Sequence, residues 1–222
     1  MDQINNANAI ENDRDQILIN NLIINHLRTN RNIKGFYNFN DAHFSFWYAV
    51  YILDYFKNHQ TYPVNISKFK ILLFDFYDIK DDETKKKNKI KNNKGKFIDN
   101  YRGFDFKNDI NKFCEMYLIG INIYTYNPFE YPQFKQIGEI NPRKSPNKLN
   151  LLAIYGEEIQ FFAITNVDNL NGRLITQEIA DDLYLNGKLT QKELKYKPFK
   201  DVYNIQLYEE NLKKLRVNMG LY

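Results

Sequence analysis

Apolar residues recur at steps of three and four positions after a short polar turn near residue 40. They are Phe46, Ala49, Val50, Leu53 and Phe56. This spacing predicts a helix whose apolar face packs into the core. Asp41 lies in the turn and can cap the helix by accepting a backbone N–H. Ser45 then lies in the first turn, where unpaired N–H groups and the helix dipole favour negative charge.

Three other stretches also have helical spacing. They are residues 10–27, residues 105–117, and residues 207–219, which end at Gly220, a typical helix stop. The apolar side of the second stretch is expected to consist of Ile110, Phe113, Met116 and Tyr117. Residues 69–77 are apolar with a mixed period, so their pattern leaves helix and strand open.

Alternating or continuous apolar patterns predict strands in the second half of the chain. Residues 119–126 alternate, and residues 149–155 form a continuous apolar run. Residues 159–165 follow across a short turn at 156–158, which predicts a hairpin whose two turn glutamates face solvent. We expect these three strands to form a central antiparallel sheet. The proline-containing segment 127–148 is expected to be an irregular excursion.

The composition is that of a folded protein of one domain, or of one domain with extensions. The chain has 222 residues, of which 43% are hydrophobic and 16% aromatic, and this is enough to bury a substantial core. Tyr and Phe, with 17 residues each, are encoded by A/T-rich codons, as are the abundant Asn, Ile and Lys. The bias points to the genome of an organelle, a protist, or an A/T-rich virus or plasmid, and it carries no information about function.

The charge allows contact with RNA or DNA without requiring it. The net charge is +4 and the pI is near 8.8, whereas dedicated nucleic-acid binders usually show a stronger imbalance. Residues 80–96 form a charged run that begins with acidic residues and continues with Lys85, Lys86, Lys87, Lys89, Lys91, Lys94 and Lys96. We expect a surface loop here. Its simpler interpretation is a solvated insertion, and the alternative is an arm that contacts phosphates.

Cysteine, histidine and hydropathy patterns argue against several kinds of site. A single cysteine, Cys114, rules out an internal disulfide and a cysteine zinc cluster, and the three histidines lack metal-ligand spacing, so we expect no cofactor or metal. No apolar run reaches the ~18 residues of a membrane span, so we expect no membrane insertion. The acidic N-terminus does not fit a signal or transit peptide. If the protein works in a mitochondrion, we expect it to be made there.

Three short blocks of the chain together carry a family resemblance. The first is NDAHFSFWYAV at residues 40–50. The second is GFDF at 103–106, with DINKF at 109–113 and INIY at 121–124. The third is NLLAI at 150–154, followed by QFFAI at 160–164 and Leu170. In this order and spacing the blocks resemble the OTU-like (papain-fold) cysteine peptidase domain of polinton-type, protein-primed DNA polymerase polyproteins.

The resemblance implies an α+β fold in which a central antiparallel sheet packs on the buried helix. The OTU-like core would span residues 36–174, with residues 80–96 as a charged insertion. Residues 1–35 would form an N-terminal helical extension. Residues 175–222 would form a C-terminal helical appendage, which either packs on the domain or serves a partner. The zinc-finger-like segment that often follows this domain in the family has no counterpart here.

The two positions that carry catalysis in the family hold other residues in this chain. Ser45 stands at the position of the nucleophilic cysteine, and Gln160 stands at that of the general-base histidine. A serine hydroxyl without a base is a poor nucleophile, and Gln cannot accept a proton at neutral pH. We therefore interpret the chain as a pseudopeptidase without catalytic residues. Cys114 is expected to be a buried core residue, and His43 is expected not to reach Ser45 productively.

The leading hypothesis is therefore a catalytically inactive OTU-like domain that is a structural or binding subunit of a larger assembly. Its partners would be proteins and also RNA, as in a mitochondrial ribosome or another ribonucleoprotein, with a mitochondrion favoured over the cytoplasm. One alternative is a hydrolase of the same fold with a rebuilt site that uses Ser45 with His43 or Cys114. The other is a nucleic-acid-binding protein of a mobile element that acts through the lysine run.

Overall fold

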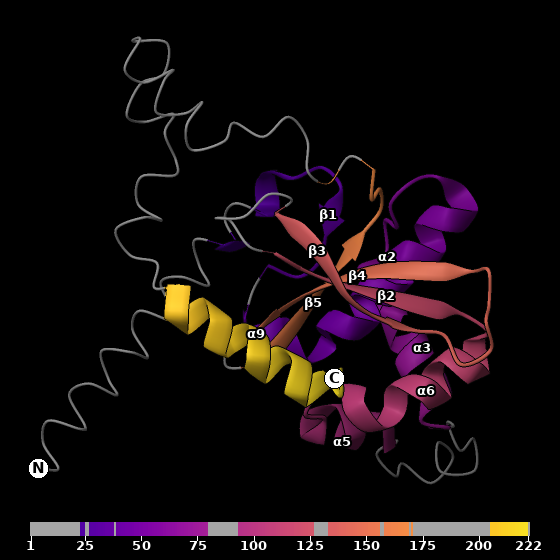
Figure 1. Ribbon diagram of the computed structural model, residues 1–222. Coiled ribbons are helices and arrows are strands. Elements are labelled where there is room, and N and C mark those ends of the chain that lie inside the picture. The colour runs from indigo at the N-terminus through magenta and orange to yellow at the C-terminus, as the bar shows by residue number, and fades with distance from the viewer. Residues whose placement is uncertain are drawn as a thin grey trace, which may run out of the picture.

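The computed structural model describes residues 23–24, 27–37, 39–79, 93–126, 133–155, 158–168, 170 and 205–221 (Figure 1). The helix expected over residues 10–27 is described only at its end, where residues 23–24 and 27–29 are helical. Most of the charged run and the segment 171–204 lie outside the described residues. Among the described helices, none combines the length and apolar character needed to cross a membrane.

A mixed sheet forms the centre of the described structure. Its strands are β1 (Ile33–Lys34), β2 (Gly120–Tyr126), β3 (Phe134–Ile140), β4 (Lys148–Tyr155) and β5 (Ile159–Ile164). They follow the order β1-β5-β4-β2-β3. The expected hairpin of β4 and β5 is confirmed as an antiparallel pair.

Two expectations about this sheet are wrong. The segment 127–148 is not an irregular excursion throughout, because β3 lies in it and pairs antiparallel with β2. The prolines of this segment flank β3 and do not interrupt it, so they leave its ladder intact. The sheet is also not purely antiparallel, since β4 pairs with β2 in parallel. The reason is that the chain leaves β3 and crosses to the other side of β2 before β4 begins.

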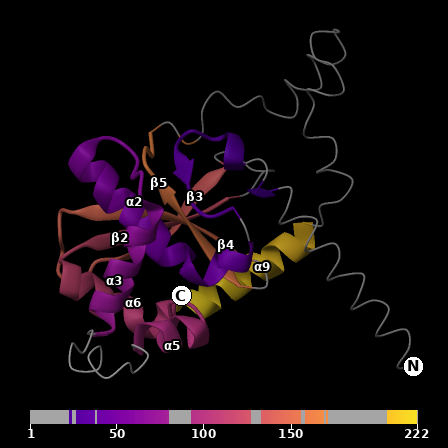
Figure 2. The same ribbon diagram turned by 180° about the vertical axis from the view of Figure 1, so that it is seen from behind.

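The described helices lie against the sheet and beyond one end of its strands. α2 (Ser45–His59) follows the 3-10 helix η1 (Phe39–Phe44) and packs on β4 and β5, as the sequence predicts. It lies in front of the strands when the molecule is seen from behind (Figure 2). η2 (Ile66–Lys68), α3 (Phe69–Phe76), α5 (Asn93–Asn100) and α6 (Phe106–Tyr117) follow along the chain. α3, α5 and α6 gather below the strands in Figure 1.

The C-terminal helix α9 (Ile205–Met219) packs on the domain. Its Leu215 and Met219 are buried in the same core as α2, and the helix contacts α6 and β4. The described part of the C-terminal segment therefore packs on the domain. Gly220 ends the helix with a φ of +68°, a left-handed conformation that glycine adopts readily.

The side chains of the strands alternate between two cores on opposite faces of the sheet. On one face, Phe161 and Ala163 of β5 join Phe46 and Trp47 of α2 and the aromatic residues of α6; we call this the α2-side core. On the other face, Phe162 and Ile164 join Leu152 and the helical residues Ile23, Ile24 and Leu27; we call this the outer core. Trp47 is fully buried, and its Nε1 donates to the hydroxyl of Tyr101 at 2.6 Å.

Several local predictions can be compared with the structure. Residues 69–76 form the helix α3, which decides a pattern that was ambiguous in sequence. Asp41 is not the cap of α2, because η1 continues up to Ser45 and the N-cap residue is Phe44, which makes no side-chain cap. The helix predicted over 105–117 is confirmed as α6, but Met116 is 47% exposed and does not belong to its buried side.

Candidate functional site

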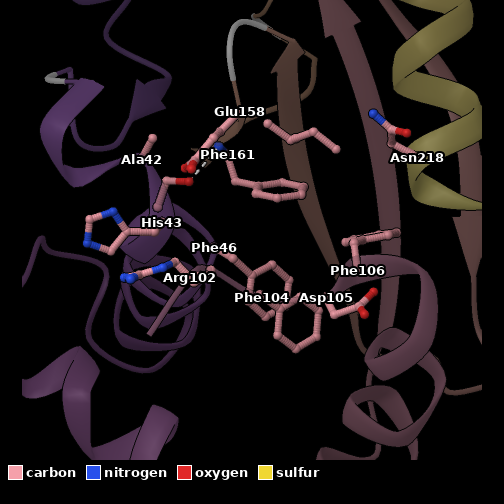
Figure 3. A pocket seen from close by; sticks show the side chains of 13 residues that line it. Ala42, His43, Phe46, Arg102, Phe104, Asp105, Phe106, Glu158, Phe161 and Asn218 are labelled. Carbon is pink, nitrogen blue, oxygen red and sulfur yellow. Dashed lines mark hydrogen bonds between the residues drawn. The ribbon is translucent and has the colours of Figure 1, made fainter. Parts of the chain in front are cut away.

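The first family block places Ser45 at the first residue of α2. Its side chain is fully buried, and its Oγ accepts a hydrogen bond from the backbone N–H of Phe161 at 3.0 Å, drawn as a dashed line in Figure 3. A residue 116 positions away in sequence thus contacts the candidate nucleophile position. The start of α2 and the start of β5 therefore meet at one point.

The second family block connects this point to α6. Gly103 has a φ of +110°, a backbone conformation that residues other than glycine rarely adopt. The turn at Gly103 brings Phe104 onto Phe46, with the two rings stacked at 3.8 Å between centroids. Asp105 then caps α6 by accepting from the backbone N–H of Asn108 at 3.1 Å and from its Nδ2 at 2.7 Å.

The third family block completes the contact through Phe161. Its ring stacks on Phe106, the first residue of α6, at 5.5 Å, and meets Phe46 edge-to-face at 5.5 Å. One residue from each block therefore touches residues from the other two. Aromatic pairs of this geometry add to the stability gained from burial. The blocks that are far apart in sequence form one aromatic cluster beside Ser45.

A cleft of about 270 Å³ opens next to Ser45. Its floor consists mainly of the aromatic cluster, and its rim carries polar and charged residues. The rim residues are His43, Arg102, Asp105, Glu158 and Asn218. In Figure 3, His43 and Arg102 lie at one end of the cleft and Asn218, from α9, lies at the other. An apolar floor with a few polar groups around it is typical of a binding cleft.

Gln160 lies in β5 but its side chain faces away from this cleft. Its cross-strand partner in β4 is Ile154, a member of the outer core, and the register between the two strands has no shift. The side chain of Gln160 is 2% exposed, and its Nε2 donates to the backbone carbonyl of Phe36. Its Oε1 has no hydrogen-bond partner among the described residues. Ser45 and Gln160 therefore flank the same strand with their side chains on opposite faces.

The other nucleophile and base candidates do not complete a catalytic pair. His43 lies in η1, and its ring is tilted by 55° against that of Phe44, with 4.3 Å between the centroids. No hydrogen bond joins it to Ser45 in the described part of the chain. Cys114 is fully buried in the α2-side core, where burial raises the pKa of its thiol to about 12. A thiol with this pKa is not a nucleophile near neutral pH.

The remaining site predictions concern the lysines of the charged run. Lys85, Lys86, Lys87, Lys89 and Lys91 lie outside the described residues. Lys94 and Lys96 belong to the helix α5 and not to a loop, so the loop predicted over 80–96 ends before Asn93. The Nζ of Lys94 lies 5.0 Å from the ring centroid of Phe74. In the described ranges, no group of three or more His, Cys, Asp or Glu side chains is placed to hold a metal ion.

The sequence did not identify four of the rim residues as part of a site: Arg102, Asp105, Glu158 and Asn218. Arg102 directly precedes the Gly103 turn, so the second block could have indicated it. Asn218 belongs to α9, and the helical pattern of that segment carries no sign that it lines the same cleft as Ser45 and Phe161. Only the tertiary structure brings it to the cleft.

Comparisons of the chain with models of protein families, with curated proteins and with solved structures find no match. The resemblance of the three blocks therefore rests on their residues alone and stays a prediction.

Proposed function

We propose that this protein is a catalytically inactive OTU-like domain that acts by binding, as a structural subunit of a larger assembly such as a mitochondrial ribosome or another ribonucleoprotein. The observation that carries the proposal is the meeting of Ser45, at the start of α2, with the N–H of Phe161, the neighbour of Gln160. In a papain-like enzyme these elements carry the nucleophile and the base. Here the same elements meet without either.

Two features support the absence of hydrolysis. The Ser45 hydroxyl accepts a structural hydrogen bond, and no described group that can act as a base at neutral pH is hydrogen-bonded to it. General-base catalysis needs such a group within hydrogen-bond reach. The side chain of Gln160 is held on the opposite face of β5 by its bond to Phe36, so position 160 does not supply the base.

The cleft supports the binding role. Its apolar floor can hold a side chain of a partner, and the charged rim of Arg102, Asp105 and Glu158 can bond to polar groups around it. A fold whose catalytic pair has been replaced can be retained for such a site. The net charge of +4 is compatible with an assembly that contains RNA.

Sedimentation of the native protein from its own cells, with and without ribonuclease, tests the assembly. We expect co-migration with a large particle that ribonuclease disrupts. Migration as a free species of 26.7 kDa would contradict the subunit role.

The second candidate function is a hydrolase with a rebuilt site, and one observation favours it. His43 lines the same cleft as Ser45, so a rearrangement of η1 could bring its ring to the hydroxyl. A fluorogenic ubiquitin-type conjugate and a polyprotein-derived peptide are suitable substrates. We expect no turnover by the wild-type protein. Turnover that disappears in Ser45→Ala but persists in Ser67→Ala, a matched change at an exposed serine, would establish the hydrolase instead.

A further inference from the structure

The helix α9 is held against the domain by one side only. Leu215 and Met219 are buried and Leu212 is partly buried, all in the α2-side core. The described side chains on the opposite side, at positions 210, 213, 214, 216 and 217, are exposed. The buried side fixes the helix, so any groups on its outer side are presented on a rigid support.

The outer side of α9 carries a group of cations. Lys213, Lys214 and Arg216 are exposed, and Lys107 of α6 lies beside the end of the helix, since a Cβ placed on Gly220 would come within 3.4 Å of its Cγ. We define Lys107, Lys213, Lys214 and Arg216 as the α9 basic face. Asn218 of the same helix lines the cleft, so the α9 basic face lies next to the candidate site.

These cations are not neutralised within the described structure. Glu210 is exposed and lies one turn before Lys214, a spacing that often gives an ion pair. The ion pair found among the described residues joins Lys148 and Glu139, which lie on β4 and β3. Among the described residues, the four cations of the α9 basic face therefore have no ion-pair partner.

The helix dipole accounts for only part of this pattern. It favours a cation in the last turn, where Arg216 lies. Lys213 and Lys214 lie before that turn. Lys213 and Arg216 are three positions apart, a spacing at which like charges on a helix face repel one another. A polyanion removes this repulsion, because its phosphates can contact several of the cations at once.

We propose that the α9 basic face binds the phosphate backbone of a nucleic acid, which in the proposed assembly is RNA. Lysine, arginine and asparagine are among the side chains that contact phosphates. An acidic protein surface is a weaker fit, because protein interfaces usually have an apolar centre, and the exposed apolar residue described on this side of α9 is Val217, at 44% exposure. The inference names a partner for the proposed function and rests on it for the choice of RNA, while the binding itself can be tested alone.

The test measures binding of the purified full chain to a fluorescein-labelled single-stranded RNA of about 20 nucleotides, over a range of salt concentrations. A DNA strand of the same sequence distinguishes the two sources of phosphate. The variant K213Q/K214Q/R216Q removes three of the cations. The control R31Q/K57Q/K68Q removes three exposed cations on other elements and causes the same change in net charge.

For the wild type we expect affinity for RNA that falls as salt rises. Each phosphate contact on a single strand contributes about 0.7 to the slope of log K against log salt, so the α9 variant should reduce that slope by about 2 and weaken binding roughly 10-fold or more near physiological salt. The control should change binding less than about twofold, because its cations lie outside the α9 basic face and salt screens exposed charges that are far apart. Both variants should keep the circular dichroism spectrum and melting temperature of the wild type.

Three outcomes would overturn the inference. The first is a wild type that does not bind RNA, and the second is equal weakening by the α9 variant and the control. The third is an unchanged α9 variant when a K85Q/K86Q/K87Q/K89Q variant loses binding, which would assign the contact to the lysine run. Binding of DNA but not RNA would also overturn the choice of RNA. None of these outcomes depends on the sedimentation of the native protein, so the inference and the proposed function fail separately.

Discussion

The two cores of this protein differ in how completely a buried polar residue beside each of them is hydrogen-bonded. In the α2-side core, Ser45 is fully buried and its hydroxyl has a partner in the N–H of Phe161. Around the outer core, Gln160 is buried with one amide atom bonded to Phe36 and the other without a partner in the described structure. The positions that form a catalytic pair in the resembling family thus have structural contacts on opposite faces of one strand.

The cores also differ in composition. Phe46, Phe104, Phe106 and Phe161 make the α2-side core largely aromatic near the cleft, whereas the outer core is formed mainly by aliphatic residues such as Leu27, Leu152 and Ile164. The difference teaches that the three family blocks are joined by ring contacts on one face only. Changes on that face should therefore disturb the candidate site, and changes on the other should affect stability alone.

The largest effect is expected for Phe46→Ala. The ring is 1% exposed and stacked on Phe104, so its loss should reduce the free energy of unfolding by about 3–5 kcal/mol. Leu27→Ala in the outer core should cost less, though still about 2 kcal/mol or more. Urea denaturation at equilibrium measures both. A larger loss for Leu27→Ala would contradict the expectation that the aromatic α2-side core contributes more to the free energy of unfolding than the outer core.

Ser45→Ala should have the next largest effect. The change leaves the buried N–H of Phe161 without its acceptor, and an unpaired buried donor costs about 1–3 kcal/mol. The exposed control Ser67→Ala should change the free energy of unfolding by less than about 0.5 kcal/mol. Equal stability of the two variants would mean that the Ser45 hydroxyl has no structural role, and it would strengthen the hydrolase alternative.

Alkaline pH should weaken both cores, through Cys114 and several buried tyrosines on the α2 side and through Tyr37 on the outer side. Burial raises the pKa of Cys114 in the α2-side core and that of Tyr37, which packs against the outer core, to about 12. The unfolded chain ionises these groups near their ordinary values of 9.0 and 10.0. Their contribution to stability is thus complete below about pH 9 and is lost as the pH rises toward 12.

The urea midpoint should accordingly fall steadily over that range. Cys114→Ala should flatten the start of this fall, near pH 9, because the ordinary pKa of the thiol, 9.0, is lower than the 10.0 of the tyrosines. A wild-type midpoint that does not change up to about pH 11 would show that neither group is protected by burial.

The smallest effect is expected for Gln160→Met. The substitution removes a buried amide that lacks one partner and keeps a similar volume, but it also removes the donor to the Phe36 carbonyl. The gain and the loss are each about 1 kcal/mol, so the free energy of unfolding should change by less than about 1 kcal/mol. A loss of more than about 3 kcal/mol in the free energy of unfolding would indicate that both amide atoms of Gln160 are hydrogen-bonded. The buried polar residues of the two cores would then not differ.

The sequence by itself determined the local elements whose patterns are regular. The spacing of apolar residues was sufficient for α2 and α6, and alternation with continuous apolar runs was sufficient for β2, β4 and β5, because a buried face imposes a period of 3.6 or 2 on its side chains. Asp105 and Gly220 mark helix ends through local hydrogen bonding and backbone conformation. Residue identity alone also showed that positions 45 and 160 hold no cysteine and no histidine.

Only the tertiary structure decided how these elements combine. The parallel pairing of β2 with β4 and the edge position of β3 depend on the path of the chain between strands, which no local pattern records. The same holds for Asn218 of α9 at the cleft. The side chain of Gln160 lies on the face of β5 opposite to the contact with Ser45, and this follows from strand register. A shift of one residue would move every side chain of the strand to the other face. Register is set by contacts between residues far apart in the sequence.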